Sequence, residues 1–224
     1  MILRRVSLAL SLALTVAATA TPAAAADLAV RLGGVGADGV LDSRHAFCIA
    51  DGYGANVSPA LSWSGAPAGT QSFVVLAHDP DVPAEFAEKA NVPGVVIAAD
   101  APRVTAHHWV LADVPATVTT LAEGAEGDVA APTRKDVGPV GHGTRHANDF
   151  GGFFGDGAHG GWDGPCPPAN DARTHRYVVT VSALDVARLD LPAEADVAAV
   201  TAAMAGHVLA SGSATATYSL FAAQ

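Results

Sequence analysis

Carboxylates, histidines and a tyrosine that are suited to ligand binding occur in four short motifs of this chain. In order, the motifs are Asp79–Pro83 (DPDVP), His107–Val110 (HHWV), Gly164–Pro168 (GPCPP) and His175–Tyr177 (HRY). Carboxylates accept hydrogen bonds from ammonium groups and amides, whereas imidazole and phenol groups can also donate to anions. Backbone N–H groups of a tight loop form concave anion sites. Together the motifs indicate a small-ligand pocket and not a familiar catalytic centre.

Asp79 and Asp81 follow the apolar run Ser72–Ala77, which is typical of a strand buried on both faces. Because proline fixes the backbone and removes a donor, Pro80 and Pro83 are expected to end that strand. Both carboxylates would then stand at a rigid strand end. An ordinary acidic turn is the alternative interpretation.

Alternation along two further strands indicates which other polar side chains share a face. Neighbouring strand residues point to opposite faces, so His107 and His108 cannot both face one site without a bulge. His175 and Tyr177 share a face, from which both can donate to an anion. Arg176 lies on the opposite face, where we expect it to pair with a carboxylate.

The Gly164–Pro168 motif predicts a rigid loop whose glycine allows close approach of the backbone to a ligand. A rigid turn without a ligand is the alternative. The same motif contains one of the chain's two cysteines, Cys166, and the other is Cys48. A disulfide between them is the leading expectation for an exported chain, and two separate buried thiols are the alternative.

Two catalytic interpretations use the same residues. A cysteine-dependent hydrolase would need Cys166 as a free thiolate with His175 as its base. A metal-dependent hydrolase would draw ligands from Asp79, Asp81 and the nine histidines. No H-E-x-x-H motif occurs. We therefore expect no metal site, no cofactor and no enzymatic activity.

Short apolar runs separated by glycine and proline predict a mostly-β domain flanked by a few helices. The predicted strands are Leu28–Leu32, Ser72–Ala77, His108–Leu111, Tyr177–Ala183 and Ala214–Phe221. One helix is predicted between Pro192, which opens it, and Gly212, which follows its last turn. Its apolar residues recur at spacings of three and four and so form one face, with Val197, Val200, Met204 and Val208.

The first 26 residues have the pattern of a secretory signal, with Arg4 and Arg5 before an apolar run of about 13 residues and small residues before Asp27. That run is shorter than the ~20 residues that span a bilayer. The remaining chain, residues 27–224, is long enough for one domain. It carries 10 basic and 22 acidic residues, a net charge of −12. This charge excludes nucleic acid as the expected partner, because nucleic-acid affinity depends on cationic contacts to phosphate.

The order of the four motifs resembles the phosphatidylethanolamine-binding protein family, in its bacterial Raf kinase inhibitor-like branch. The resemblance extends over Asn56–Ser219 and implies a single domain with a central β-sheet, a smaller sheet and a few flanking helices. It implies a pocket formed by Asp79, Asp81, Pro83, His108, Gly164, Cys166, Pro167, His175 and Tyr177. It places His108 inside this pocket and His107 outside it.

Two departures from the family's pattern bear on the pocket. Ala106 stands where the family often has a large aromatic residue, two residues before the pocket histidine. Residues 84–106 form a longer connection than in many relatives. Within it, Glu85–Lys89 is expected as a helical turn or loop and Gly94–Ala98 as a short strand. The segment either covers the pocket or is a surface excursion.

Together with the signal pattern of residues 1–26, the resemblance implies an exported, non-enzymatic binding protein, periplasmic or secreted. Its ligand would be a small anion such as phosphate or a phospholipid headgroup, and a protein partner that it modulates is a further expectation. His108 and His175 would lie near the anion, and Asp79 near any cationic end. A metal-dependent or cysteine-dependent hydrolase in the same pocket is the alternative.

The signal pattern predicts that the mature protein begins near Asp27 outside the cytoplasm, because signal peptidase cuts after small residues such as Ala23–Ala26. N-terminal sequencing of the protein from its native host measures this directly. Recovery of intact Met1 in the soluble cytoplasmic fraction would contradict it.

Overall fold

The computed structural model describes residues 27–155 and 157–221, so the predicted signal at 1–26 lies outside the described residues. No helix in the described part of the chain is long and apolar enough to cross a membrane. The described residues form the mostly-β fold that the sequence predicts.

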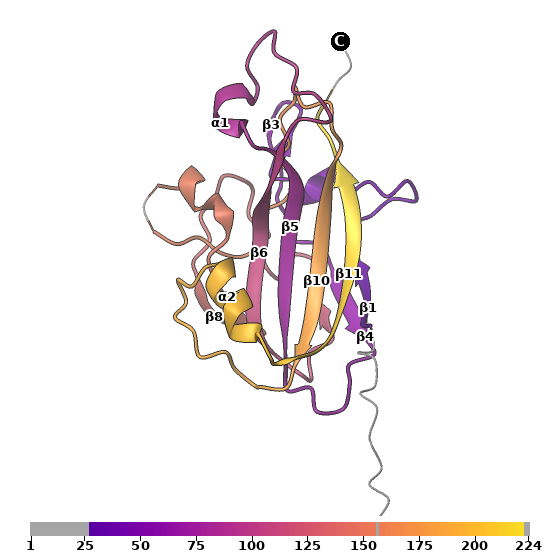
Figure 1. Ribbon diagram of the computed structural model, residues 1–224, viewed down its shortest axis with the longest axis vertical. Helices are drawn as coiled ribbons and strands as arrows, with labels where there is room; N and C mark the ends of the chain where they lie inside the picture. Colours follow the sequence, from indigo (N-terminus) through magenta and orange to yellow (C-terminus); the bar gives the residue numbers. More distant parts are fainter. Residues whose placement is uncertain (1–26, 156, 222–224) are drawn as a thin grey trace, which may run out of the picture.

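A six-stranded antiparallel sheet with the order β11-β10-β5-β6-β9-β8 forms the centre of the molecule (Figure 1). Its strands are β5 (Ser72–Pro83), β6 (Arg103–Pro115), β8 (Gly138–Val140), β9 (Gly143–Arg145), β10 (His175–Leu184) and β11 (Val208–Tyr218). The smaller sheet, ordered β1-β4-β7, contains β1 (Ala29–Leu32), β4 (Leu61–Ser64) and β7 (Thr120–Leu121). A hairpin pairs β2 (Cys48–Ile49) with β3 (Gly52–Tyr53). The flanking helices are α1 (Phe86–Lys89), α2 (Val197–Met204) and the 3-10 helices η1 (Ser43–His45) and η2 (Asp149–Phe153).

Apolar side chains on the two faces of the central sheet form two cores. The larger core contains Trp63, Phe73 and Trp109, and the rings of Trp63 and Phe73 pack edge-on with centroids 5.3 Å apart. On the other face, Val74 packs with residues of α2, which lies in front of the sheet in Figure 1. Successive residues of β5 are therefore apolar because both faces of this strand are covered.

Helix α2 is shorter than the sequence predicts. It begins where the side chain of Asp196 accepts a hydrogen bond from the N–H of Ala199 at 2.9 Å. The chain leaves the helical path by Gly206, whose φ of +84° is left-handed. Val208, predicted to lie on the apolar face of the helix, and Gly212, predicted to follow its last turn, lie in β11 instead. Pairing of this segment with β10 along its length outweighs the local helical spacing.

Strand β5 continues through Pro80 and ends at Pro83, so the prediction that the strand ends at these prolines is wrong for Pro80 and confirmed for Pro83. Strand β10 pairs with β5 only as far as His78, and beyond it β6 is the neighbour that pairs with β5. Proline has no backbone N–H, so a strand tolerates it where no neighbouring strand needs a hydrogen bond from that position. The register between β5 and β6 shifts between Asp79 and Val82, which redirects side chains that simple alternation would place together.

The segment of residues 84–106 packs against the loop that follows the proline-rich motif. Helix α1 is the helical turn expected there, but the predicted strand at Gly94–Ala98 is absent. Ile97 forms only an isolated bridge with Asp171. The side chain of Asn170 donates to two backbone carbonyls of the segment, each at 2.9 Å.

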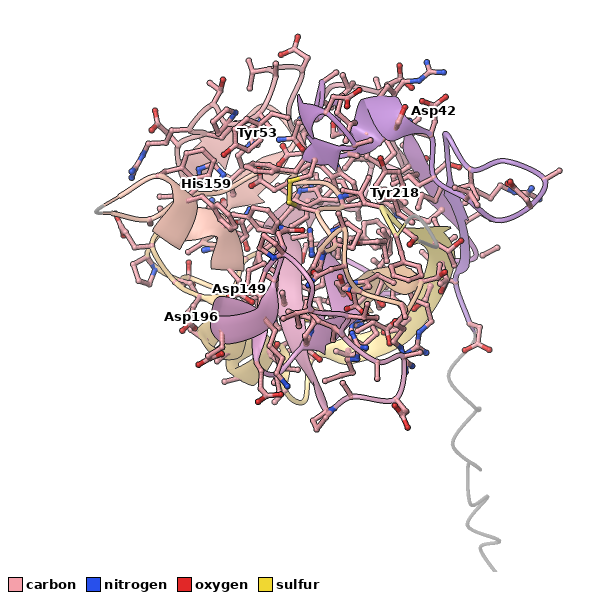
Figure 2. The ribbon with its side chains drawn as sticks, turned by 90° about the horizontal axis from the view of Figure 1, so that it is seen from above. Asp42, Tyr53, Asp149, His159, Asp196 and Tyr218 are labelled. Carbon is pink, nitrogen blue, oxygen red and sulfur yellow. A yellow bond between two sulfur atoms is a disulfide. The ribbon has the colours of Figure 1, made fainter. Side chains whose placement is uncertain are left out.

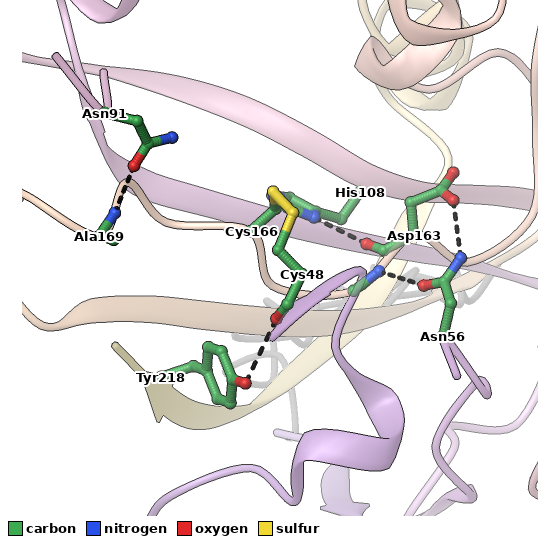
Figure 3. The surroundings of a disulfide bond; sticks show 9 residues. Cys48, Asn56, Asn91, His108, Asp163, Cys166, Ala169 and Tyr218 are labelled. Carbon is green, nitrogen blue, oxygen red and sulfur yellow. Dashed lines mark hydrogen bonds between the residues drawn. A yellow bond between two sulfur atoms is a disulfide. The ribbon is translucent and has the colours of Figure 1, made fainter. Parts of the chain in front are cut away.

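A disulfide joins Cys48 of β2 to Cys166 in the proline-rich loop (Figures 2 and 3). The two residues are 118 positions apart, and their Cα atoms are 4.6 Å apart. The bridge confirms the predicted pairing and excludes two free thiols in the oxidised chain. It fastens the early part of the chain to the loop that carries the third motif.

Replacing both cysteines, Cys48→Ala with Cys166→Ala, is expected to lower the free energy of unfolding. The chain-entropy model assigns about 4–5 kcal/mol to a loop of this length, and removal of native disulfides typically costs about 2–5 kcal/mol. Urea unfolding of the oxidised protein and of the double variant measures the difference. Equal stabilities would show that the bridge does not restrain the unfolded chain.

Candidate functional site

A cavity of about 180 Å³ lies between the ends of β5 and β6, helices α1 and η2, and the proline-rich loop. Its lining residues are Asp79, Val82, Phe86, Ala106, His108, Asp149, Phe150, Phe153, Cys166, Pro168 and His175. We call Asp79, His108 and His175 the polar floor, since all three are at most 3% exposed. Phe86, Phe150 and Phe153 form the aromatic wall.

Both ring nitrogens of His175 are bonded to carboxylates. Nδ1 lies 2.7 Å from Oδ2 of Asp79, and Nε2 lies 3.0 Å from Oδ2 of Asp171. Burial alone would lower the pKa of His175, but the two carboxylates outweigh it and raise the pKa above its usual value. The raised pKa favours the imidazolium, in which both N–H groups donate to these two carboxylates inside the protein. His175 lines the cavity as expected, yet it has no N–H left for an anion.

Arg103 extends this row of charges into the segment of residues 84–106. Its guanidinium donates to Oδ1 of Asp171 at 3.0 Å and to the carbonyl of Asp81 at 2.8 Å. The order Asp79, His175, Asp171, Arg103 alternates acid and base from the cavity outward. The sequence analysis did not single out Asp171 or Arg103, although the position of Asp171 four residues before His175 was a usable signal.

His108 is held in one tautomer by the backbone. Its Nδ1–H donates to the carbonyl of Asp163 at 2.7 Å, as Figure 3 shows. Burial lowers its pKa, so the ring is neutral near pH 7 and Nε2 carries a lone pair. Nε2 makes no well-formed hydrogen bond among residues 27–155 and 157–221, although the backbone of Gly164 also contacts the ring and acts to raise its pKa. The rings of Phe150 and Tyr177 pack against the imidazole at centroid distances of 4.8 and 5.2 Å.

Hydrogen bonds to the carboxylate of Asp163 fix the backbone that contacts His108. Its carboxylate accepts hydrogen bonds from Asn56 (3.0 Å), Lys135 (2.7 Å), Asn148 (2.8 Å) and His159 (2.6 Å). Burial opposes ionisation, but His159 and Lys135 lower the pKa of Asp163 below its usual value. The resulting network fixes the main-chain carbonyl that determines the tautomer of His108.

Asp81 does not line the cavity, contrary to expectation. Its carboxylate accepts two hydrogen bonds from the guanidinium of Arg176, at 2.8 and 3.0 Å, and lies 2.6 Å from Nε of Arg173. Burial opposes ionisation, yet these cations lower the pKa of Asp81 to about 2. The irregularity of β5 after Asp79 turns Asp81 away from the cavity. The expected pairing of Arg176 with a carboxylate is confirmed.

The other expected pocket residues support the cavity without lining it. Gly164 is required because a Cβ there would lie 1.8 Å from the carbonyl oxygen of His45. Pro167 lines a separate surface depression beside the disulfide, together with Cys48 and Cys166. Pro83 is the last residue of β5. Tyr177 is 1% exposed, and its burial is the largest cause that raises its pKa well above the usual value. The negative charge of Asp79 is the second cause and acts in the same direction. Its hydroxyl has no well-formed hydrogen bond among the described residues.

The cavity's outer edge includes Asp149, which the sequence analysis did not assign to the pocket. Oδ2 of Asp149 accepts hydrogen bonds from the backbone N–H (2.7 Å) and Nδ1 (3.0 Å) of His107. Burial opposes ionisation, but His107 lowers the pKa of Asp149. His107 itself is not a lining residue, which agrees with the predicted alternation. Phe86 and Phe153 belong to no motif that marked them as wall residues.

Comparisons with known proteins identify the family of this chain. Residues 34–219 match the family model described as phosphatidylethanolamine-binding protein. The UPF0098 protein YbhB of Escherichia coli K12 is 35% identical over 185 residues, which cover 80% of this chain and 92% of YbhB. The "Putative lipoprotein LppC" of Mycobacterium tuberculosis is 33% identical over 161 residues, 72% of this chain and 58% of LppC. The crystal structure of E. coli YbcL, described as a new member of the mammalian PEBP family, has a TM-score of 0.63 and 27% identity. It covers 87% of this chain and 99% of YbcL.

Removing the charge of Asp81 is expected to destabilise the protein and to change its response to acid. Asp81→Asn should cost about 2 kcal/mol at pH 7, less than the ~3–5 kcal/mol of a fully buried pair, since Arg176 is half exposed. Because the pKa of Asp81 is lowered, its stabilisation is present above pH ~4 and is lost as the pH falls towards 2.

Urea unfolding at pH 7 and at pH 3 tests both statements. Asp190→Asn is the matched control, because the side chain of Asp190 is 88% exposed, and it should change stability by less than about 0.5 kcal/mol. Identical stabilities of the two variants at pH 7 would show that the ion pair contributes nothing.

Proposed function

Because this chain belongs to the phosphatidylethanolamine-binding protein family, we propose that it is an exported, non-enzymatic binding protein. Its cavity holds a small phosphate-bearing ligand of the phospholipid-headgroup type. The observation that carries this proposal is the cavity itself, whose polar floor is rigidly bonded and whose wall is aromatic. Ligand sites commonly combine a few oriented polar groups with apolar and aromatic side chains in this way.

The size of the cavity supports a headgroup-sized ligand. Its volume of about 180 Å³ is below the ~300–1,000 Å³ of pockets that enclose drug-sized molecules. The side chain of Phe153 is 52% exposed at the edge of the cavity, so a longer ligand can extend past it towards solvent. The same exposed ring is available to a protein partner whose binding depends on occupancy of the cavity.

The bonding of the lining residues supports binding without catalysis. Cys166 is joined to Cys48 and is no nucleophile in the oxidised chain. His175, the base that a cysteine hydrolase would use, donates from both ring nitrogens to carboxylates. A nucleophilic mechanism requires a nucleophile within hydrogen-bond reach of an available base, and neither residue is available for that role.

Three observations support export. The first is the signal pattern of residues 1–26, and the second is the disulfide, since disulfides persist in oxidising compartments. The third is the similarity to a mycobacterial relative whose name describes a lipoprotein. The proposed location is periplasmic or secreted.

Phosphoethanolamine is expected to bind in this cavity, as measured by calorimetry with NMR shifts at His108 and Phe150. Ala106→Phe should weaken binding by about ten-fold or more, because a buried phenyl ring would occupy space that Ala106 leaves open. Thr105→Phe is the matched control, since Thr105 is the exposed neighbour of Ala106 on β6 and does not line the cavity. Absence of binding, or equal affinity of the two variants, would reject the proposed site.

A further inference from the structure

Two histidines outside the cavity face each other across strands β5 and β6. His78 of β5 is paired in register with His107 of β6, and their ring centroids lie 6.2 Å apart with an interplanar angle of 45°. Neither residue lines the cavity. Both are partly exposed, so a dissolved ion can reach the rings. Directly paired strand residues are neighbours on one face of a sheet, and the register of the two strands therefore holds this histidine pair together.

An irregularity in β6 separates the histidine pair from the cavity. Ala77 pairs with Trp109 and His78 pairs with His107, so β6 carries one extra residue, His108, between these positions. A bulge of this kind changes the direction of side chains that simple alternation would fix. His108 lines the cavity, whereas His107 packs beside His78. The two adjacent histidines of the HHWV motif thus belong to different surroundings.

The hydrogen bonds of the pair leave nitrogen lone pairs available. Nδ1 of His107 donates to Oδ2 of Asp149 at 3.0 Å, so Nε2 of the neutral ring has a lone pair. The ring of His78 makes no hydrogen bond within the described part of the chain. Histidines that bind a metal usually donate their second nitrogen to a carboxylate, which fixes the tautomer and makes the binding nitrogen more basic. His107 and Asp149 already have this arrangement.

The charges around His78 are compatible with a bound cation. The negative charge of Asp79 acts on the ring from the neighbouring position of β5. The positive charge of Arg176 on β10 also acts on it, but the carboxylate of Asp81 accepts two hydrogen bonds from that guanidinium. Burial, followed by the repulsion of His107, lowers the pKa of His78 and favours the neutral imidazole that binds metals.

We propose that His78 and His107 together bind a divalent transition-metal ion, with Asp149 orienting the ring of His107. Imidazole nitrogen is a preferred ligand of Cu²⁺, Ni²⁺ and Zn²⁺. An ion ~2.0–2.1 Å from one nitrogen of each ring places the ring centres roughly 5–6 Å apart, so the observed 6.2 Å requires only a small rotation. No group of three or more His, Cys, Asp or Glu side chains among residues 27–155 and 157–221 is arranged to hold a metal. Water therefore completes the coordination of this two-histidine site.

The sequence did not indicate this site, because the two histidines belong to no common motif. The expectation of no metal site rested on the absence of a metal-binding motif. Only the register between β5 and β6 brings His78 and His107 together. The inference does not depend on the ligand of the cavity, since neither histidine lines it.

Calorimetric titration of the tag-free protein with Cu²⁺ tests the site. His78→Gln and His107→Gln should each weaken the tightest Cu²⁺ site by at least about ten-fold, because only one imidazole remains. His207→Gln is the matched control, since His207 is a partly exposed histidine whose Nδ1 lies 2.8 Å from Oδ1 of Asp185. The control should change the affinity by less than about two-fold. Unchanged affinity in the two test variants, or an equal loss in the control, would overturn the inference.

Pulsed EPR of the Cu²⁺ complex counts the imidazole ligands independently of affinity. The unmodified protein should show two, and His78→Gln and His107→Gln should each show one. Asp149→Asn should keep both signals and weaken binding by about ten-fold, because the amide still accepts from Nδ1 of His107 but lacks the negative charge. A single imidazole in the unmodified protein would overturn the site, and unchanged affinity in Asp149→Asn would overturn the orienting role of Asp149.

Zinc titration followed by ¹⁵N NMR of the histidine rings needs no variant. One equivalent of Zn²⁺ should shift the ring nitrogens of His78 and His107 together and leave those of His207 unchanged. Shifts confined to other histidines would overturn the inference. Such a result would leave the headgroup function standing, because that function is tested by phosphoethanolamine binding in the cavity.

Discussion

The cavity depends on a row of buried charges in which each acid lies between two bases or beside one. Asp79, His175, Asp171 and Arg103 follow one another from the floor of the cavity to the segment of residues 84–106. An unpaired buried ion costs several kcal/mol, so loss of one member would leave its neighbour uncompensated. The segment of residues 84–106 is therefore more than a surface excursion, because its Arg103, the first residue of β6, ends the row and its Phe86 lines the cavity.

Two further restraints fix the remaining sides of the cavity. The network around Asp163 holds the carbonyl that orients His108, and the disulfide holds the loop that contains Cys166. These restraints come from parts of the chain that are distant in sequence, and they meet beside the same cavity (Figure 3). A site whose polar groups are already oriented loses little conformational freedom when a ligand binds, and this preorganisation favours affinity.

The sequence predicts the elements and part of the site, for identifiable physical reasons. Asp79, His108 and His175 could be placed because the order of the motifs carries the family resemblance, and strand alternation adds only that His107 and His108 face opposite ways. Asp81 could not, because the irregularity of β5 depends on which strands pair with it. The end of α2 was missed for the same reason, since long-range pairing with β10 decides where β11 begins. Phe153 follows no motif and reaches the cavity through tertiary packing alone.

Which groups of the site donate hydrogen bonds and which accept them was the property hardest to predict from the sequence. A histidine and a carboxylate can donate or accept according to their partners, and those partners are set by the fold. His108 could donate to an anion if it were charged, but the Asp163 carbonyl takes its Nδ1–H and burial lowers its pKa, so Nε2 is an acceptor. Residues 27–224 carry a net charge of −12, so local groups of the cavity, and not the long-range field of the protein, would have to hold an anionic ligand.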